Sequence, residues 1–206
     1  PEELVTRAAE LGLAAIAIAD RNTLAGVVRA WSALKTLREE TAAAIRIRSQ
    51  HRTDTCSRLE TGSPEDIAPP AALHLPKLIV GCRLVLRDSP VHWLALPQDR
   101  AAYHRLSRLL TLGKRRAGKG ECHLDLADLL EGCTSMILIA LPPARPAEAA
   151  PDIRRMQRRF PGQVFVGAAP RYDGSDQAWL AACAALAVRT SAPMVAPAAS
   201  KCLPTV

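Results

Sequence analysis

Residues 11–30, LGLAAIAIADRNTLAGVVRA, decide the fold class because they predict a buried strand that runs directly into a helix. The run at residues 13–19 is apolar at every position, which favours a parallel strand covered on both faces. After the turn at residues 20–23, apolar residues recur at helical spacing. Because chemistry in α/β folds lies at the C-terminal ends of parallel strands, we expect a site near Asp20 and Arg21.

The alternation of strand and helix continues along the chain. Apolar runs predict further strands at residues 77–86, 91–96, 136–141, 164–167 and 194–196. Amphipathic spacing predicts helices at residues 1–11, from Asp99 onward, in HLDLADLLEG (123–132), and at residues 152–160 and 176–189. This pattern indicates an α/β fold with parallel strands and outer helices. The chain has neither G-x-G-x-x-G nor a Walker A sequence, so we favour a distorted (β/α) barrel over a nucleotide-binding sheet.

One internal segment breaks the alternation. Residues 41–76 mix charged residues, Ser, Thr and Pro with little periodicity, and we expect a surface loop or insertion there. The chain also starts with PEELVTRAAELG, which resembles a helix already in progress, with Gly12 as its stop. We therefore expect an element that precedes Pro1 to be missing.

Composition limits the classes of protein that remain. With 49% hydrophobic residues among 206, the chain can build a substantial core. No apolar run of about 18 residues exists, so we expect no membrane partner. The six cysteines form no C-x-x-C pair, which favours buried reduced thiols in a cytoplasmic protein. Cys122, His123 and Cys133 are a weak alternative zinc site, because their spacing fits no usual pattern.

The net charge of +7 is compatible either with a polyanionic partner or with charges that are merely solvated. Two short segments concentrate the basic residues, and both are candidates for binding nucleic acid phosphates. They comprise Lys114, Arg115, Arg116 and Lys119 in a glycine-containing loop, and Arg154, Arg155, Arg158 and Arg159 on a predicted helix.

Several stretches resemble the PHP (polymerase and histidinol phosphatase) domain of bacterial C-family DNA polymerases, and most closely that of the error-prone polymerases related to the DNA polymerase III alpha subunit. They are PEELVTRAAELGLAAIAIADRNTLAGVVRA, KLIVGCRLVL, VHWLALPQDRAAYHRLSRLLTLGKRRAGKG, HLDLADLLEG with MILIALPP, and DQAWLAACAALAVRTSAPMVA. The resemblance implies a (β/α)7 barrel, here incomplete. It also implies a cluster of metal ions at the strand ends that can support phosphoester hydrolysis.

The ligands of that implied cluster are largely replaced in this chain. The family's opening His-x-His would precede Pro1, its Asp-His corresponds to Asp20-Arg21, and its Gly-Cys-Glu corresponds to Gly81-Cys82-Arg83. His92 matches a family histidine, and Asp20 is the other residue that could still bind a metal. The remaining altered ligand positions are Pro142, Ala199 and Lys201. Arginine cannot coordinate a metal, so the resemblance implies a degenerate site.

Three functions remain open at this stage. The favoured one is a catalytically inactive, structural PHP-like domain within an error-prone polymerase that acts in translesion DNA synthesis and repair, in the cytoplasm. Its partners would be DNA, the polymerase core and other damage-tolerance proteins. Such a fragment needs no cofactor, whereas the parent polymerase would use Mg²⁺. The second is a phosphoesterase that uses Zn²⁺ or Mn²⁺ held by Asp20, His92, His104 and His123. The third is a nucleic-acid-binding module formed by the two basic clusters.

Overall fold

The computed structural model describes residues 1–55 and 75–196, with the side chains of residues 48–55 left aside. These residues form two compact units. The first contains residues 1–18 and 25–80, and the second contains residues 19–24 and the chain from residue 81 onward. Strands β1 (Ala15–Arg21) and β2 (Lys77–Val85) pass from one unit into the other.

The first unit pairs helix α1 (Glu2–Glu10) with the long helix α2 (Ala25–Thr55), and Arg29 Nε donates to Glu2 Oε1 at 3.1 Å. Gly12 ends α1 as predicted, with a φ of +63° and the N–H of Leu13 bonded to the carbonyl of Ala8 at 3.0 Å. Helix α2 extends to Thr55, so the expectation of a loop is wrong for residues 41–55. Residues 56–74 of that predicted loop lie outside the described part of the chain.

The strands form one sheet in the order β1-β2-β3-β4-β5-β6. The remaining strands are β3 (His92–Pro97), β4 (Met136–Leu141), β5 (Val164–Gly167) and β6 (Met194–Val195). β4, β5 and β6 are parallel, as expected, whereas β3 is antiparallel to both β2 and β4. The short turn between β2 and β3 forces that reversal, because only antiparallel neighbours can be joined by a tight hairpin.

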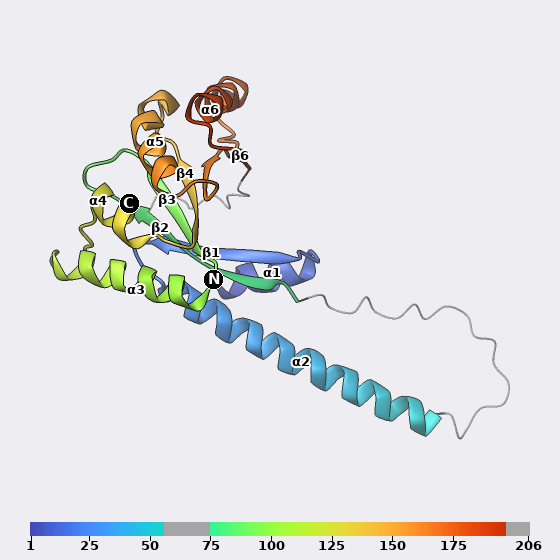
Figure 1. The fold of residues 1–206 in the computed structure, drawn as a ribbon. Helices are drawn as coiled ribbons and strands as arrows, with labels where there is room; N and C mark the ends of the chain where they lie inside the picture. The colour runs from blue at the N-terminus through green and yellow to red at the C-terminus, as the bar shows by residue number, and fades with distance from the viewer. Residues whose placement is uncertain (56–74, 197–206) are drawn as a thin grey trace. The chain divides into compact units, whose positions relative to one another are not determined.

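Helices α3 (Arg100–Arg115), α4 (Leu126–Gly132), α5 (Ala150–Arg159) and α6 (Asp176–Thr190) complete the second unit, with a 3-10 turn at Pro146–Ala149 (Figure 1). Asp99 caps α3 as predicted, because its Oδ1 accepts the N–H of Ala102 at 2.6 Å. The fold class, α/β with a central sheet and outer helices, is therefore confirmed. Across the described residues β1 and β6 are the edges of the sheet, and closure of a barrel stays a prediction.

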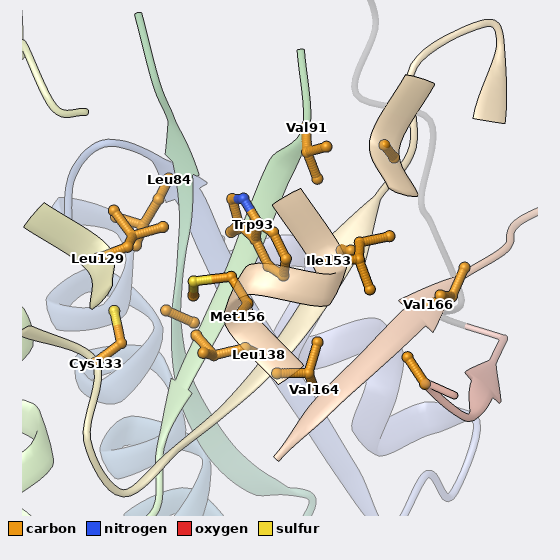
Figure 2. Packing of buried hydrophobic residues seen from close by; sticks show 14 of the residues in the cluster. Leu84, Val91, Trp93, Leu129, Cys133, Leu138, Ile153, Met156, Val164 and Val166 are labelled. Atoms are coloured by element: carbon orange, nitrogen blue, oxygen red, sulfur yellow. The ribbon is translucent and has the colours of Figure 1, made fainter. Parts of the chain in front are cut away.

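The core lies on one face of this sheet, which we call the covered face. Figure 2 shows Ile153 and Met156 of α5 over Trp93, Leu138 and Val164 of the strands. All five side chains are fully buried. The second face of the same strands carries partly exposed residues, and we call it the partly exposed face. Its members are Arg83, Val85, His92, Leu94, Leu96, Ile137, Ile139, Leu141 and Phe165. No helix in the described part of the chain is long and apolar enough to cross a membrane.

Candidate functional site

Three of the positions singled out in the sequence, Arg83, His92 and Pro142, meet at one end of the sheet. His92 opens β3, opposite Val85 near the end of β2 and opposite Leu141 at the end of β4. Pro142 follows β4 directly, and Arg83 lies two residues before the end of β2. We call this region the sheet end. It coincides with the C-terminal ends of β1, β2 and β4, where the sequence predicted a site.

Asn22 fixes the end of β1 against β2. Its N–H donates to the carbonyl of Arg83 at 2.9 Å, its Oδ1 accepts the N–H of Val85 at 2.9 Å, and its Nδ2 donates to the carbonyl of Val85 at 3.3 Å. Its φ of +50° suits asparagine, which tolerates left-handed backbone better than most residues. The side chain thus continues the ladder past β1 and holds Arg21 beside Arg83.

Alternation along the strands separates Asp20 from the other candidates. Asp20 and Arg21 are successive strand residues, so their side chains leave opposite faces of the sheet. Cys82 Sγ, on the covered face, donates to the carbonyl of Asp20 at 3.4 Å. Arg83 lies diagonally from His92 on the partly exposed face, within reach for a long side chain. The structure therefore brings Arg21, Arg83 and His92 together and directs Asp20 elsewhere.

The electrostatics of the sheet end disfavour added positive charge. Partial burial lowers the pKa of His92 below 6.5, and the charges of Arg83 and then Arg21 lower it further. Its imidazole is therefore neutral at pH 7. The Nε of Arg83 is buried and has no hydrogen-bond partner among the described residues. Two guanidinium groups thus act on one neutral histidine.

These residues do not fit a metal cluster. The family's metal ions require several carboxylate, imidazole or thiolate ligands, whereas the described residues at this end of the sheet offer one imidazole with two guanidinium groups acting on it. Among the side chains of residues 1–47 and 75–196, no three from His, Cys, Asp or Glu lie close enough together to hold an ion. The predicted positions Ala199 and Lys201 lie outside the described residues. We therefore derive no chemistry through a metal here.

The other candidate ligands form no group with His92 that could hold an ion in the described part of the chain. His104 is exposed on α3, and His123 Nε2 lies 3.3 Å from Glu121 Oε2 in the segment before α4. Cys82, Cys133 and Cys183 are buried free thiols, and burial raises the pKa of Cys82 and of Cys133 to about 12. Cys122 is half-buried and free. The described cysteines are thus reduced packing residues, as expected, while Cys56 and Cys202 lie outside the described part.

The two basic clusters divide into anchored and unanchored side chains. Arg116 Nη1 binds both carboxylate oxygens of Asp128 at 2.9 and 2.7 Å, and Arg159 Nε donates to the carbonyl of Leu130 at 3.1 Å. Arg154 Nη2 reaches a main-chain carbonyl on α6 at 3.4 Å. The side chains of the remaining members make no hydrogen bond or ion pair with another described residue. They are Lys114, Arg115, Lys119, Arg155 and Arg158.

A groove of about 990 Å³ between α3 and α4 was missed by the sequence reasoning. Arg105 and Arg108 line it together with Arg115 and Arg116, although neither belongs to the predicted clusters. A helical reading of residues 104–116 could have found them, because Arg108 and Arg115 lie two turns apart on one helix face. Charges that are adjacent in sequence lie together in a loop, whereas charges three, four or seven residues apart lie together on a helix.

Comparisons with known proteins place this geometry in a family. The PHP domain family matches residues 1–149. An error-prone DNA polymerase of Ruegeria pomeroyi is 74% identical over 196 residues, which cover 95% of this chain and 18% of that protein. Error-prone DNA polymerases of Rhodopseudomonas palustris and Brucella abortus are 40% and 35% identical, over 88% and 95% of this chain. The chain spans between 14% and 18% of the length of these three relatives.

The fold also matches a solved structure. A Bifidobacterium adolescentis protein assigned to the metal-dependent phosphoesterases superposes with a TM-score of 0.52, covering 95% of this chain and 80% of the other. At 13% sequence identity, this likeness concerns the fold alone. The family match over residues 1–149 and the 74% identical relative settle the assignment: this chain belongs to the PHP domain family.

Proposed function

We propose that this chain is the PHP region of an error-prone DNA polymerase, and that it supports the polymerase core without hydrolysing phosphoesters itself. The observation that carries the proposal is the position of Arg21 and Arg83 beside His92 at the sheet end. A scaffold that keeps its sheet and core while its ligand positions carry cations has retained a structural role. The identity of 74% with a polymerase supports the link to DNA synthesis.

The physical argument is one of charge. A divalent ion near two guanidinium groups meets repulsion from both, at a site where neither group can lose its proton. The Nε of Arg83 is buried, so this part of the guanidinium group lies within the sheet and not in solvent. A metal-dependent phosphoesterase, the rival function, needs a ligand set that this region does not offer.

The wider setting of the proposal follows from the relatives. As part of an error-prone polymerase, the chain would pack against the polymerase core of the same protein and lie near DNA. The polymerase core would supply Mg²⁺ for nucleotidyl transfer, and this region would need no cofactor. Translesion synthesis, contact with other damage-tolerance proteins and a cytoplasmic location belong to the same proposal.

Restoration of the family's ligands tests the proposal. We expect the wild-type chain to bind neither Zn²⁺ nor Mn²⁺ stoichiometrically after gel filtration, as measured by elemental analysis. Arg21→His combined with Arg83→Glu should increase the bound metal, because it removes two cations and adds two potential ligands beside His92. Arg155→His with Arg158→Glu on α5 makes the same change of charge at another surface and should bind none.

Hydrolysis assays separate the structural role from the rival function. Wild-type chain incubated with Mn²⁺, Zn²⁺ or Mg²⁺ should not release phosphate from a phosphomonoester, or nucleotides from a DNA 3′ end. Turnover that a chelator abolishes, together with one equivalent of metal in the wild-type chain, would contradict the proposal. Loss of such turnover in His92→Ala would then assign the activity to the sheet end.

A further inference from the structure

The groove between α3 and α4 combines a defined hollow with a surplus of positive charge. It is lined by four arginines, Arg105, Arg108, Arg115 and Arg116, and by two carboxylates, Asp128 and Glu131. Four positive and two negative groups leave an excess of two positive charges. The sheet end already described contributes nothing to this groove. Some of these arginines bind groups of the fold, and the others are available to a ligand.

Two of the arginines are bound into the fold and shape the groove. Arg116 holds both oxygens of Asp128, whose side chain is only 11% exposed and whose Oδ2 also accepts the N–H of Asp125 at 2.9 Å. Arg105 donates through Nε and Nη2 to the carbonyl of Thr134 at 3.0 and 2.8 Å. These contacts join α3 to the two ends of α4, so the walls of the groove are fixed.

The other two arginines have no such role. Arg108 and Arg115 make no hydrogen bond or ion pair with a described residue, and both are exposed. They lie seven residues apart on α3, which places them on one face at a separation of about 10 Å along the helix axis. Arg115 also interacts favourably with the helix C-terminus, but Arg108 lies in mid-helix, where the dipole gives its charge no structural explanation.

The lining also indicates which part of a nucleic acid would fit. No Phe, Tyr or Trp side chain lines the groove, and the imidazole of His104 is the one ring among the lining residues on which a base could stack. Two exposed guanidinium groups on one helix face instead suit the phosphates of a continuous strand, which they contact independently of sequence. The hydroxyl groups of Ser107 and Thr111, also in the lining, donate to the carbonyls of Tyr103 and Ser107 at 3.0 and 2.8 Å, so the arginines supply the donors for phosphate.

We propose that the α3–α4 groove binds the phosphodiester backbone of DNA through Arg108 and Arg115, between walls set by Arg105 and Arg116. The choice of DNA as the polyanion rests on the proposed function. The binding surface differs from the two basic clusters of the sequence analysis, because it includes Arg108 and excludes the arginines of α5. Sequence-independent retention of DNA near the polymerase core would be its role.

A charge-matched comparison tests the groove. Binding of a fluorescein-labelled, mixed-sequence single strand is followed by fluorescence anisotropy across a series of salt concentrations. We expect Arg108→Gln with Arg115→Gln to raise Kd about tenfold and to reduce the slope of log K against log salt by about 1.4, since two phosphate contacts are lost. Arg155→Gln with Arg158→Gln removes the same charge from α5 and should change Kd less than about twofold.

The competing explanations give different results. Equal weakening by the two double substitutions would show binding by net charge alone and would overturn the proposal, as would no binding by wild-type chain at low salt. Displacement of the oligonucleotide by a deoxynucleoside triphosphate at equal phosphate concentration would assign the groove to free nucleotides. Tighter binding of poly-glutamate than of DNA would assign it to an acidic protein segment. Neither result affects the proposed inactive PHP role, because metal content and hydrolysis test that separately.

Discussion

The two faces of the sheet in the second unit are built by the same strands and have opposite chemistry. On the covered face, Leu84, Trp93 and Leu138 are fully buried under helices. On the partly exposed face, the alternate positions carry Arg83 and His92 among half-buried aliphatic residues. Hydrophobic packing thus constrains one face strictly, while the other accommodates a guanidinium group and an imidazole.

Truncation of one side chain on each face should give the largest difference in the free energy of unfolding. Leu138→Ala removes a fully buried side chain from the core, and we expect the free energy of unfolding to fall by about 3 to 4 kcal/mol. Ile139→Ala, one residue further along β4 but on the partly exposed face, should cost about 1 to 2 kcal/mol. Urea denaturation followed by far-UV circular dichroism measures both. Equal losses would mean that the two faces are equally well packed.

An added methyl group should show where the partly exposed face is nevertheless tight. A Cβ on Gly167 would lie 2.9 Å from Ile139 Cγ2 and from Leu141 Cδ2, and 3.3 Å from the carbonyl of Ala140. We therefore expect Gly167→Ala to lower the free energy of unfolding by about 1 to 3 kcal/mol. Gly132→Ala is the control, because its Cβ would meet Leu109 at an ordinary 3.5 Å. An unchanged denaturation midpoint for Gly167→Ala would show that Ile139 and Leu141 move freely.

The smallest expected effect is a dependence of stability on pH at the sheet end. The pKa of His92 is lower in the folded chain than its ordinary value of 6.5, so the unfolded chain takes up the proton first as the pH falls. Its contribution to stability is complete above pH 6.5 and is lost as the pH falls from there through the folded-state pKa. Thermal denaturation of wild-type chain and His92→Gln between neutral and acidic pH measures this difference.

The control for the dependence of stability on pH is His104→Gln, which changes an exposed histidine on α3. This variant should keep the wild-type dependence on pH, because Arg21 and Arg83 still act on His92. If His92→Gln follows the wild-type curve throughout, the two guanidinium groups do not act on the imidazole. The electrostatic argument against a metal would then lose its support from the histidine.

Much of the fold could be predicted because its signals are local. The strand at residues 136–141 was predicted with both of its ends, and the N-cap at Asp99 followed from residue type and position. Helix α2 beyond residue 40 was missed, because its residues 42–47 are all exposed and so give no apolar periodicity to detect. The high helix propensity of its Ala, Glu and Arg residues was the signal that remained.

The candidate site also has features that the sequence alone determines and features that depend on the tertiary structure. Residue identity alone determined that cations occupy positions 21 and 83, because no fold can turn a guanidinium group into a metal ligand. Tertiary structure decided that Arg21 and Arg83 lie near His92, whereas the side chain of Asp20 leaves the other face of the sheet. It also decided that Arg116 binds Asp128, whereas the side chain of Arg108 has no such partner among the described residues. The physical reason is the distance along the sequence over which each property is set. Charge and periodicity belong to neighbouring residues, whereas the partner of a long side chain is chosen by strands and helices that are distant in sequence.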